Sequence, residues 1–327
     1  MRFVVVGLGS MGRRRIRLLK QISDKFEIVG VDSKIERCQQ AENELAITTK
    51  SSLKEALEEK KTDGVIISTS PLSHASIINE ALNASCNVFT ELNLVADMYD
   101  ENISLAKEKG KVLFLSSTFL YRDEIRYIRS QVEKNKGPLN YNYHAGQYLP
   151  DWHPWESIHN YFVGDKRTNG CRELFAIELP WIIKVFGEIE SFEVLSSKNT
   201  ELGIQYKDNY LLLVKHKNGN KGVFAVDVVS RKPVRNLEIY GENLYMTWDG
   251  SPAGLHLYDY EKKVNNNIDL YDNTVDKQDG YAAFIIENAY KKELETFIDK
   301  INGTGTAEHT FEEDLKVLSL IDEIEER

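Results

Sequence analysis

The chain has 327 residues, enough for about two domains, since globular domains usually span roughly 100–200 residues. Hydrophobic residues make up 42% of the chain and aromatic residues 10%, a composition that excludes a disordered or fibrous protein. The formal net charge of −10 disfavours nucleic acid and anionic membranes as main partners, because both attract an excess of Lys and Arg. We therefore expect a small-molecule ligand, no nucleic acid and no membrane.

The cysteines give no sign of an oxidising compartment or of a metal. Cys38, Cys86 and Cys171 are widely separated and odd in number, which is not the pattern of a disulfide framework or of a zinc site. The opening run from Met1 to Gly7 is too short for a signal peptide and has the pattern of a strand. These features predict a cytoplasmic protein without a metal.

Short apolar runs alternate with amphipathic stretches over the first 120 residues. This alternation predicts βαβ units and a doubly wound parallel sheet of the Rossmann type. The expected strands are Phe3–Val6, Glu27–Val31, Gly64–Ser68, Asn87–Glu91 and Val112–Ser116, and the expected helices are Met11–Ile22, Leu53–Glu59, Ala75–Ala84 and Asp97–Lys109.

The pattern changes after about residue 138, where tyrosine-rich segments alternate polar and apolar residues. Such segments predict an α+β domain with a largely antiparallel, open sheet, and an open sheet face favours a homodimer or homotetramer. We place the domain boundary between residues 121 and 122, with the closing helices as candidates to pack back on the first domain. The expected strands are Asn140–Tyr148, Ser191–Ser197, Tyr210–Lys217, Lys221–Val229, Asn236–Glu242 and Gly254–Glu261, the expected helices are Arg172–Phe186, Ala283–Ile301 and Phe311–Glu325, and Asn265–Asn267 has the composition of a turn.

A dinucleotide-binding fingerprint occupies the first strand–helix junction. Gly7, Gly9 and Gly12 match the spacing GxGxxG directly after an apolar strand, and Asp32 ends the next strand. In this context the first glycine forms a tight turn, the second admits a pyrophosphate, and the third lets helix and strand pack closely. Asp32 would bind a ribose diol, which favours NAD, whereas nearby basic residues leave NADP open. A glycine turn without a nucleotide is the weaker alternative.

Four motifs together resemble the Gfo/Idh/MocA family of sugar and cyclitol oxidoreductases. They are Gly7–Gly12, Thr69–His74, Val88–Asn93 and Tyr148–Trp155, and the resemblance extends over nearly the whole chain. It implies a Rossmann domain followed by a domain with an open antiparallel sheet. The cofactor-binding residues that the fingerprint and the resemblance imply are Gly7, Gly9, Ser10, Met11, Gly12, Arg13, Asp32, Ser33, Thr69, Pro71, His74, Glu91 and Asn93.

Two departures from the family pattern affect its chemistry. The lysine of the family's E-K-P motif falls on Leu92, and the expected catalytic histidine falls near Ile177. Neither side chain exchanges protons, so an acid–base group must come from elsewhere or be absent.

Two residues are candidates for that acid–base group, His153 and Glu173. His153 lies in a loop that interleaves aromatic rings with carboxylates, which suits a sugar, although the same loop would also serve as packing at a domain seam. We expect His216, His256 and His309 to be exposed. The expected substrate-binding residues are Tyr148, Asp151, Trp152, Trp155, Arg172 and Glu178.

The sequence thus favours an NAD(P)-dependent oxidoreductase that transfers hydride between nicotinamide and a carbinol carbon of a sugar, phosphorylated or nucleotide-linked forms included. One alternative is a catalytically silent relative that binds NAD(H) as a sensor or partner subunit. Another is a reaction without net redox change, such as epimerisation or elimination with transient oxidation.

Overall fold

The structure is a computed structural model that describes residues 1–271 and 286–327. It divides into two compact units. Unit 1 comprises Met1–Thr118 and Tyr290–Lys316, and unit 2 comprises Phe119–Ala289 and Val317–Arg327.

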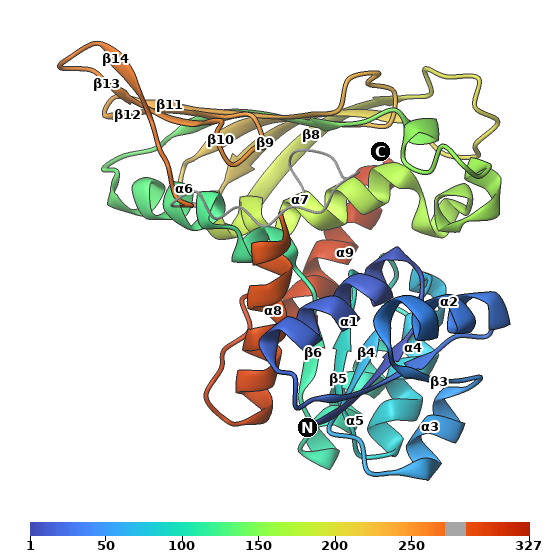
Figure 1. Cartoon of the computed structure of the whole chain (residues 1–327). Helices are drawn as coiled ribbons and strands as arrows, with labels where there is room; N and C mark the ends of the chain where they lie inside the picture. The colour runs from blue at the N-terminus through green and yellow to red at the C-terminus, as the bar shows by residue number, and fades with distance from the viewer. Residues whose placement is uncertain (272–285) are drawn as a thin grey trace. The chain divides into compact units, whose positions relative to one another are not determined.

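Unit 1 is built on a six-stranded, all-parallel sheet with the strand order β3-β2-β1-β4-β5-β6 (Figure 1). The order reverses between β1 and β4, and ligands of such sheets collect at the carboxyl ends of the strands at this point. The strands are β1 (Arg2–Val6), β2 (Glu27–Val31), β3 (Thr48–Lys50), β4 (Gly64–Ile67), β5 (Asn87–Thr90) and β6 (Leu113–Leu115). The helices that flank them are α1 (Ser10–Ile22), α2 (Ile35–Leu45), α3 (Leu53–Glu59), α4 (Pro71–Asn83), α5 (Tyr99–Lys109) and α8 (Glu287–Ile301).

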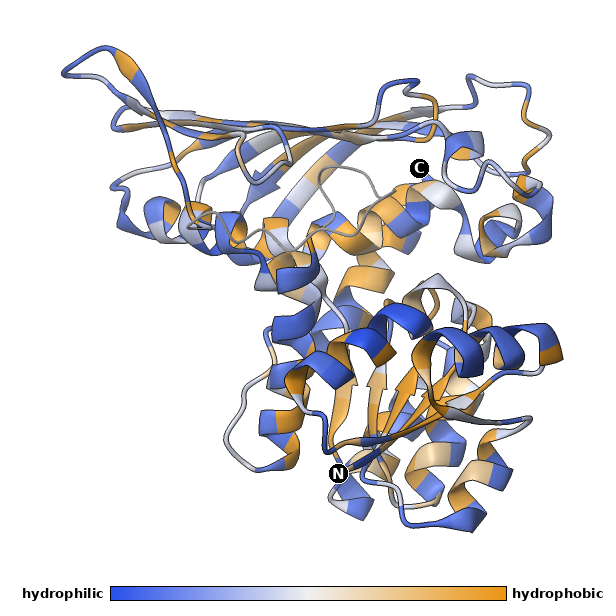
Figure 2. Cartoon of the chain, viewed as in Figure 1, coloured by the Kyte–Doolittle hydropathy of each residue, from blue (hydrophilic) through white to orange (hydrophobic). Residues whose placement is uncertain are grey.

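The core of unit 1 joins the sheet to the late segment of the chain. Strand β1 is buried along its whole length, and hydrophobic residues fill the strands of this sheet (Figure 2). The ring of Phe297, on α8, lies with its centroid 5.6 Å from that of Phe89 and 5.8 Å from that of Phe114. Aromatic pairs at such separations contribute beyond their buried area, so Phe297 fixes α8 against the sheet.

Unit 2 contains an eight-stranded sheet in the order β14-β13-β12-β11-β7-β10-β9-β8, antiparallel except for the parallel pair β7–β10. Helices α6 and α7 lie along one face of this sheet (Figure 1). Its strands are β7 (Asn140–Gly146), β8 (Ile189–Ser197), β9 (Asn209–His216), β10 (Lys221–Asp227), β11 (Val234–Gly241), β12 (Leu244–Trp248), β13 (Leu255–Asp259) and β14 (Val264–Asn267). The helices are α6 (Asp123–Lys134) and α7 (Gly170–Phe186), with short 3-10 turns between residues 149 and 168, and α9 (Phe311–Glu326) is divided between the two units.

The two faces of the eight-stranded sheet differ in composition. On β9 the side chains of Tyr210, Leu212 and Val214 are buried, whereas Leu211 and Leu213 on the opposite face are 47% and 61% exposed. Alternation of this kind places one face on the core and leaves the other open.

The predicted fold class is confirmed, with differences in detail. The helices α2 and α6 and the strands β3 and β12 were not expected, and Asn265–Asn267 is part of strand β14 rather than a turn. The expected helix Ala283–Ile301 is observed from Glu287, and residues 283–285 lie outside the described part of the chain. None of the helices in residues 1–271 and 286–327 is long and apolar enough to span a bilayer.

The expectation that His216 and His309 are exposed is wrong. His216 is fully buried and His309 is 4% exposed. The hydroxyl of Tyr141 lies 3.0 Å from Nε2 of His216, and the carbonyl of Gly187 lies 2.6 Å from Nδ1, so both ring nitrogens have partners inside unit 2. A buried imidazole is tolerated when its nitrogens are hydrogen-bonded in this way.

Candidate functional site

The glycines of the fingerprint meet distinct steric demands at the carboxyl end of β1. Gly7 has a φ of +92°, a conformation that favours glycine, and a Cβ there would lie 2.5 Å from the carbonyl oxygen of Ser68. A Cβ on Gly12 would lie 1.8 Å from the carbonyl oxygen of Gly7. Both positions therefore require glycine for the turn and for the packing of α1 on the sheet.

Gly9 is different, because a Cβ there would meet only Arg37 Nη1, at 4.0 Å. It is the N-cap residue of α1, it has no side chain to occupy the first N–H groups, and the first turn of α1 has no acidic residue. A helix N-terminus that is open in this way attracts phosphate. The cradle at Gly9 thus fits the pyrophosphate of a dinucleotide, and the exposed Ser10 and half-buried Met11 follow it.

Gly9→Ala should separate cofactor binding from folding. The added methyl group enters open space, so the melting temperature should stay near that of the wild type while the affinity for NAD falls. Gly12→Ala, in contrast, should lower both, because its methyl group collides with backbone. Calorimetric titration with NAD and thermal unfolding of both variants measure the two effects. Unchanged NAD affinity in Gly9→Ala would show that this cradle does not hold the pyrophosphate.

Asp32 is fixed at the end of β2 by two backbone donors. The N–H of Leu8 donates to its Oδ2 at 2.8 Å, and the N–H of Lys34 donates to its Oδ1 at 2.9 Å. Each carboxylate oxygen accepts more than one hydrogen bond, so capacity is left for a ribose diol. Arg37 Nη1 lies 3.6 Å from Oδ2. Asp32 is 8% exposed, whereas Ser33, which is also predicted to bind the cofactor, is exposed.

A buried chain of hydrogen bonds supports the loop after β4. His74 Nε2 lies 3.0 Å from the carbonyl of Thr69, and His74 Nδ1 lies 2.8 Å from Asn93 Oδ1. Asn93 Nδ2 donates to the hydroxyl of Tyr99 at 3.0 Å, and that hydroxyl donates to Asp314 at 2.5 Å. Burial lowers the pKa of His74. His74 and Asn93, both predicted as cofactor residues, therefore position the Thr69 loop from beneath.

The N-terminus of α4 contributes the rest of that loop. Pro71 begins the helix and is buried, and the hydroxyls of Thr69 and Ser73 lie 2.8 Å apart. Arg13, on α1, pairs with Glu44 at 3.4 Å and is partly exposed. The structure thus brings the predicted residues of the β1, β2 and β4 ends to one edge of the sheet.

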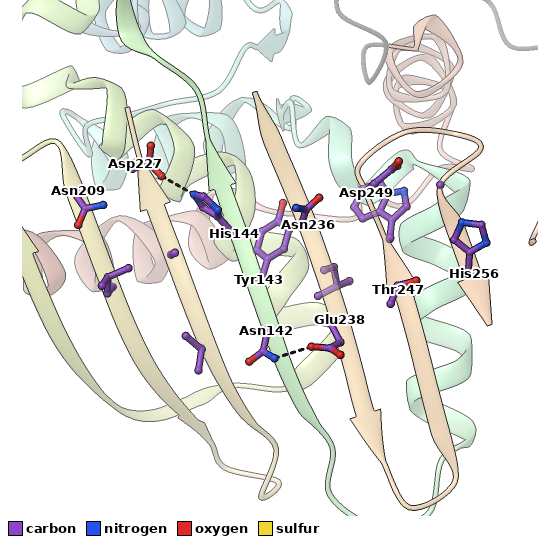
Figure 3. A pocket seen from close by; sticks show the side chains of 16 residues that line it. Asn142, Tyr143, His144, Asn209, Asp227, Asn236, Glu238, Thr247, Asp249 and His256 are labelled. Carbon is purple, nitrogen blue, oxygen red and sulfur yellow. Dashed lines mark hydrogen bonds and ion pairs between the residues drawn. The ribbon is translucent and has the colours of Figure 1, made fainter. Parts of the chain in front are cut away.

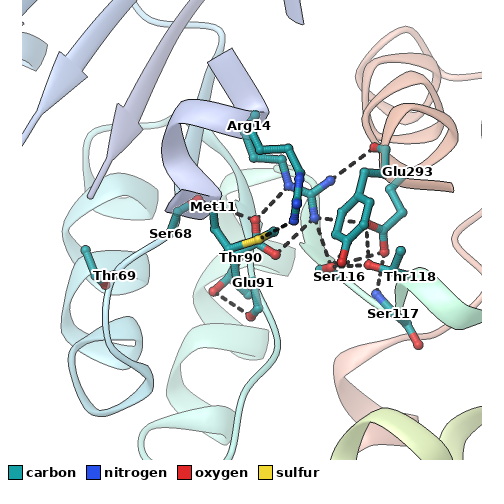
Figure 4. Close-up of polar contacts among 12 residues, drawn as sticks. Met11, Arg14, Ser68, Thr69, Thr90, Glu91, Ser116, Ser117, Thr118 and Glu293 are labelled. Carbon is teal, nitrogen blue, oxygen red and sulfur yellow. Dashed lines mark hydrogen bonds and ion pairs between the residues drawn. The ribbon is translucent and has the colours of Figure 1, made fainter. Parts of the chain in front are cut away.

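Glu91, the carboxylate kept from the E-K-P motif, belongs to a buried ion cluster (Figure 4). Arg15 is fully buried and donates to both oxygens of Glu91, at 2.7 and 3.0 Å, and to Glu293 at 2.9 Å. Burial disfavours the charged guanidinium, yet the two carboxylates raise its pKa above the usual value. Glu293 also accepts from the backbone N–H of Ser117 at 2.6 Å and from the hydroxyl of Thr118 at 3.1 Å.

In unit 2, the predicted substrate loop forms a set of stacked rings. The ring of His153 stacks on Trp155 at 5.1 Å and on Tyr161 at 4.4 Å between centroids. Its Nδ1 lies 2.8 Å from Oε1 of Glu156, so a carboxylate orients the imidazole. Trp155 is 76% exposed.

The remaining residues of the predicted substrate loop are more closely tied to their own unit. Trp152 Nε1 donates to the carbonyl of Gln147 at 3.2 Å, and the guanidinium of Arg231 lies 3.6 Å from the ring centroid of Tyr148. Asp151 is exposed. Of the predicted substrate-binding residues in this loop, Asp151 and Trp155 are therefore the exposed ones.

Glu173, in the first turn of α7, has the environment of an acid–base group. Its Oε2 is closed off from solvent and has no hydrogen-bond partner within residues 1–271 and 286–327. Burial raises the pKa of Glu173 to about 7, and Arg235 partly opposes the shift. A carboxyl that titrates near neutrality is suited to proton transfer at physiological pH.

The structure gives Arg172 and Glu178, predicted to bind substrate, other partners. Arg172 donates to Glu325 at 2.5 Å and to Asp322 at 2.7 Å. Glu178 is fully buried, and it accepts from the Tyr143 hydroxyl at 2.7 Å. The other donors to Glu178 are Trp181 Nε1 at 2.6 Å and Arg235 Nε at 2.9 Å. Because carboxylates pair with Arg172 and internal donors bind Glu178, we do not include these two residues in the substrate site.

A groove of about 680 Å³ lies on the open face of the eight-stranded sheet (Figure 3). His144 Nε2 lies 2.6 Å from Asp227 Oδ2, and Asn142 donates to Glu238 at 2.8 Å. None of the predicted site residues lines this groove. Within the described ranges no group of three His, Cys, Asp or Glu side chains is arranged to hold a metal ion.

Sequence reasoning missed two residues of these clusters. Arg15 is not among the predicted site residues, although its spacing from Gly12, Ile16 and Leu19 places it on the buried face of α1. Tyr161, which stacks on His153, is not among them either.

Comparison with known proteins agrees with this geometry. Residues 1–117 match the Gfo/Idh/MocA family model, described as an oxidoreductase family with an NAD-binding Rossmann fold. No curated protein matches the chain in sequence.

Solved structures of similar fold cover nearly the whole chain. UDP-N-acetylglucosamine 3-dehydrogenase GnnA from Acidithiobacillus ferrooxidans is 19% identical, with a TM-score of 0.74 over 99% of this chain and 96% of that one. Levoglucosan dehydrogenase in complex with NADH and L-sorbose is 12% identical, with a TM-score of 0.81 over 100% and 96%. Biliverdin reductase from Synechocystis sp. PCC 6803, in complex with biliverdin and NADP+, is 16% identical, with a TM-score of 0.75 over 99% and 97%.

These likenesses, all at low identity, establish the two-domain fold and leave the substrate open. The family match over residues 1–117 agrees with the resemblance found in the sequence. Residues 1–117 are thus similar to the NAD-binding Rossmann domain of the Gfo/Idh/MocA oxidoreductase family.

Proposed function

We propose that the chain is an NAD-dependent oxidoreductase that acts on a sugar or sugar derivative, with Glu173 as the acid–base group. The observation that carries the proposal is the state of that carboxyl: its Oε2 is buried, has no partner in the described part of unit 2, and has a pKa of about 7. A structural carboxylate would have a donor, as Glu178 has on the same helix.

The residues of unit 1 would hold the cofactor. The N-terminus of α1 at Gly9 would bind the pyrophosphate, and Asp32 would accept hydrogen bonds from the adenosine ribose. A carboxylate at this position repels a 2′-phosphate, which favours NAD over NADP. When bound, nicotinamide supplies the hydride acceptor or donor, and the protein contributes orientation and proton transfer.

The residues of unit 2 would bind the substrate and move its proton. In the oxidative direction Glu173 takes the hydroxyl proton as the carbon–hydrogen bond breaks with its electron pair, and in reduction it returns that proton to the carbonyl oxygen. The exposed ring of Trp155 suits the C–H face of a sugar, and Asp151 suits its hydroxyls. His153, held by Glu156, is the second candidate for proton transfer.

Native mass spectrometry, followed by absorbance of reduced nicotinamide while sugars and nucleotide sugars are added, tests this function. We expect bound NAD(H) whose redox state changes with one class of sugar. A cofactor that binds yet never changes redox state would favour the sensor, and product formation without net redox change would favour epimerisation or elimination. A chain that binds neither NAD nor NADP would contradict the proposal.

We also propose that the open face of the eight-stranded sheet joins two or four copies of the chain. Leu195, Leu211, Leu213 and Val223 are exposed there by 43–75%, and apolar clusters of this kind usually mark association surfaces. The same mass spectra report the assembly. We place the protein in the cytoplasm, because its three cysteines are free.

A further inference from the structure

Four buried side chains of unit 1 form a relay of hydrogen bonds between helix α9 and the loop after β4. They are His74, Asn93, Tyr99 and Asp314, each at most 4% exposed, and together they are called the His74–Asp314 relay. At the loop end the relay meets the carbonyl of Thr69. Thr69 lies against the glycine turn of the fingerprint, because a Cβ on Gly7 would lie 3.0 Å from Thr69 Cγ2. The relay therefore ends at the carboxyl edge of the parallel sheet, where ligands collect.

The carboxylate of Asp314 determines the direction of the hydrogen bonds in this relay. An ionised carboxylate only accepts, so the hydroxyl of Tyr99 donates to it at 2.5 Å, and His309 Nε2 lies 3.2 Å from its other oxygen. Tyr99 Oη in turn accepts from Asn93 Nδ2 at 3.0 Å. The amide oxygen of Asn93 is thereby directed at His74 Nδ1, at 2.8 Å. Because an amide oxygen only accepts, Nδ1 carries a proton.

The other ring nitrogen of His74 also faces a group that only accepts. Nε2 lies 3.0 Å from the carbonyl oxygen of Thr69, so a hydrogen bond there needs a second proton on the ring. Burial lowers the pKa of His74, and its hydrogen bonds and the carboxylate of Glu91, which pairs with Arg15, oppose this shift only in part. At pH 7.5 the ring is therefore neutral, and the lone pair of Nε2 faces the carbonyl oxygen without a hydrogen bond.

We propose that Asp314 holds His74 in the Nδ1–H tautomer and thereby limits the affinity for NAD, because the Thr69 loop lacks a hydrogen bond from the ring. Asp314 and Tyr99 are then positioning residues, which affect the cofactor through His74 and the loop. The inference rests on the NAD binding of the proposed function. It follows from preorganisation, because a loop that is fixed in advance binds a ligand more tightly than a loop that must be ordered on binding.

Asp314→Asn should reverse the relay. The new amide has both a donor and an acceptor, so it can donate to Tyr99 Oη while its oxygen still accepts from His309. The hydroxyl of Tyr99 then donates to Asn93, and the turned amide of Asn93 donates to His74 Nδ1. The neutral ring now carries its proton on Nε2 and donates it to the loop carbonyl. In this variant every contact of the relay is a hydrogen bond, without a charged group.

Two measurements at pH 7.5 test the proposal. Nitrogen-15 NMR of protein labelled in histidine distinguishes the tautomers in the absence of NAD, and His74→Gln assigns the signal. We expect Nδ1–H in the wild type and Nε2–H in Asp314→Asn. In calorimetric titration the variant should bind NAD about 2- to 10-fold more tightly, the effect of one hydrogen bond. The same tautomer in both proteins, or a variant that binds NAD no more tightly than the wild type, would overturn the proposal.

Glu313→Gln is the matched control, because it removes the same charge from the adjacent residue. Glu313 Oε2 lies 3.7 Å from His309 Nδ1 and takes no part in the relay. The tautomer of His74 and the affinity for NAD should therefore equal those of the wild type. If this control tightens NAD binding as much as Asp314→Asn does, the effect comes from net charge and the proposal is wrong.

Tyr99→Phe provides a second variant, which also serves if Asp314→Asn does not fold. The ring can keep its contact with Phe311, at 4.9 Å between centroids, while the loss of the hydroxyl frees the Asn93 amide to turn. The melting temperature should fall, because Asn93 and Asp314 each lose a partner, yet His74 should change to Nε2–H and NAD should bind more tightly. A relay with a purely structural role would instead lose NAD affinity together with stability.

The failure of this inference can be distinguished from the failure of the proposed function. A wild-type protein that binds no NAD would contradict the proposed function, and with it the effect of Asp314 on affinity. The tautomers are measured without NAD, so they still decide whether Asp314 directs the relay. A wild type that binds NAD and has His74 in the Nε2–H form would overturn the inference alone.

Discussion

Glu173→Gln should lower kcat by about 10²- to 10⁴-fold, the range that general acid–base catalysis contributes. Glutamine keeps the shape of the side chain and cannot exchange a proton in the working pH range. In the wild type, sugar oxidation should rise with pH through about 7, because Glu173 must be ionised to accept the hydroxyl proton. Reduction should fall over the same range, because the acid must be protonated. Both limbs should disappear in Glu173→Gln when kcat is measured between pH 5 and 9.

Glu173→Gln should also change how the melting temperature depends on pH. The pKa of Glu173 is raised from 4.5 to about 7 in the folded chain, so its contribution to stability is full below about pH 4.5 and is lost as the pH rises to about 7. The melting temperature of the wild type should therefore fall from about pH 5 to pH 7 relative to that of Glu173→Gln and change little above pH 7. Glu178→Gln, on the same helix, is the control, and it should lose stability at every pH because three internal donors lose a charged acceptor. A Glu173→Gln enzyme with an unchanged pH profile would instead favour His153 as the acid–base group.

Arg15→Met should destabilise the protein by about 3–5 kcal/mol, the usual loss when one partner of a buried ion pair is removed. The substitution leaves Glu293, which is fully buried, without a counter-charge. Burial already raises the pKa of Glu293 despite the neighbouring guanidinium, so the variant should bind a proton there and lose most stability at high pH. Urea unfolding at pH 6 and pH 8 measures the difference.

The double variant Arg15→Met/Glu293→Gln is the control for charge. It removes the isolated carboxylate and should recover part of the lost stability, more at pH 8 than at pH 6. If the single variant is as stable as the wild type at both values, the cluster does not hold α8 to the sheet through its charges.

The cofactor half of the site could be predicted from sequence because its signals are local. Gly7, Gly9 and Gly12 lie within one strand–helix turn, and Asp32 is fixed by the end of the next apolar strand. The continuous apolar strands also defined the parallel sheet. A motif that spans few residues and has one steric interpretation can be recognised without knowledge of the tertiary contacts.

The rest depended on contacts that no local pattern contains. Arg15 reaches Glu293 across 278 residues, so no pattern near Arg15 shows that its guanidinium is buried in an ion pair. His216 lies on the same face of β9 as the buried Tyr210 and Val214. This spacing indicates burial, but the polarity of histidine suggested exposure. The partners of Glu178 lie on β7, α7 and β11, which only the sheet order brings together.

The discontinuity of unit 1 has a consequence for the order in which the chain is made. The ribosome releases Arg15 and Glu91 early, whereas Glu293 and Phe297 emerge near the end of synthesis. Until then the nascent Rossmann segment lacks the second carboxylate that Arg15 binds, and Phe89 lacks its contact with Phe297. Strand β7 must likewise wait for β10 and β11 on either side of it. Because non-local pairing is slow, this topology leaves apolar surface of both sheets exposed until the late segments are synthesised.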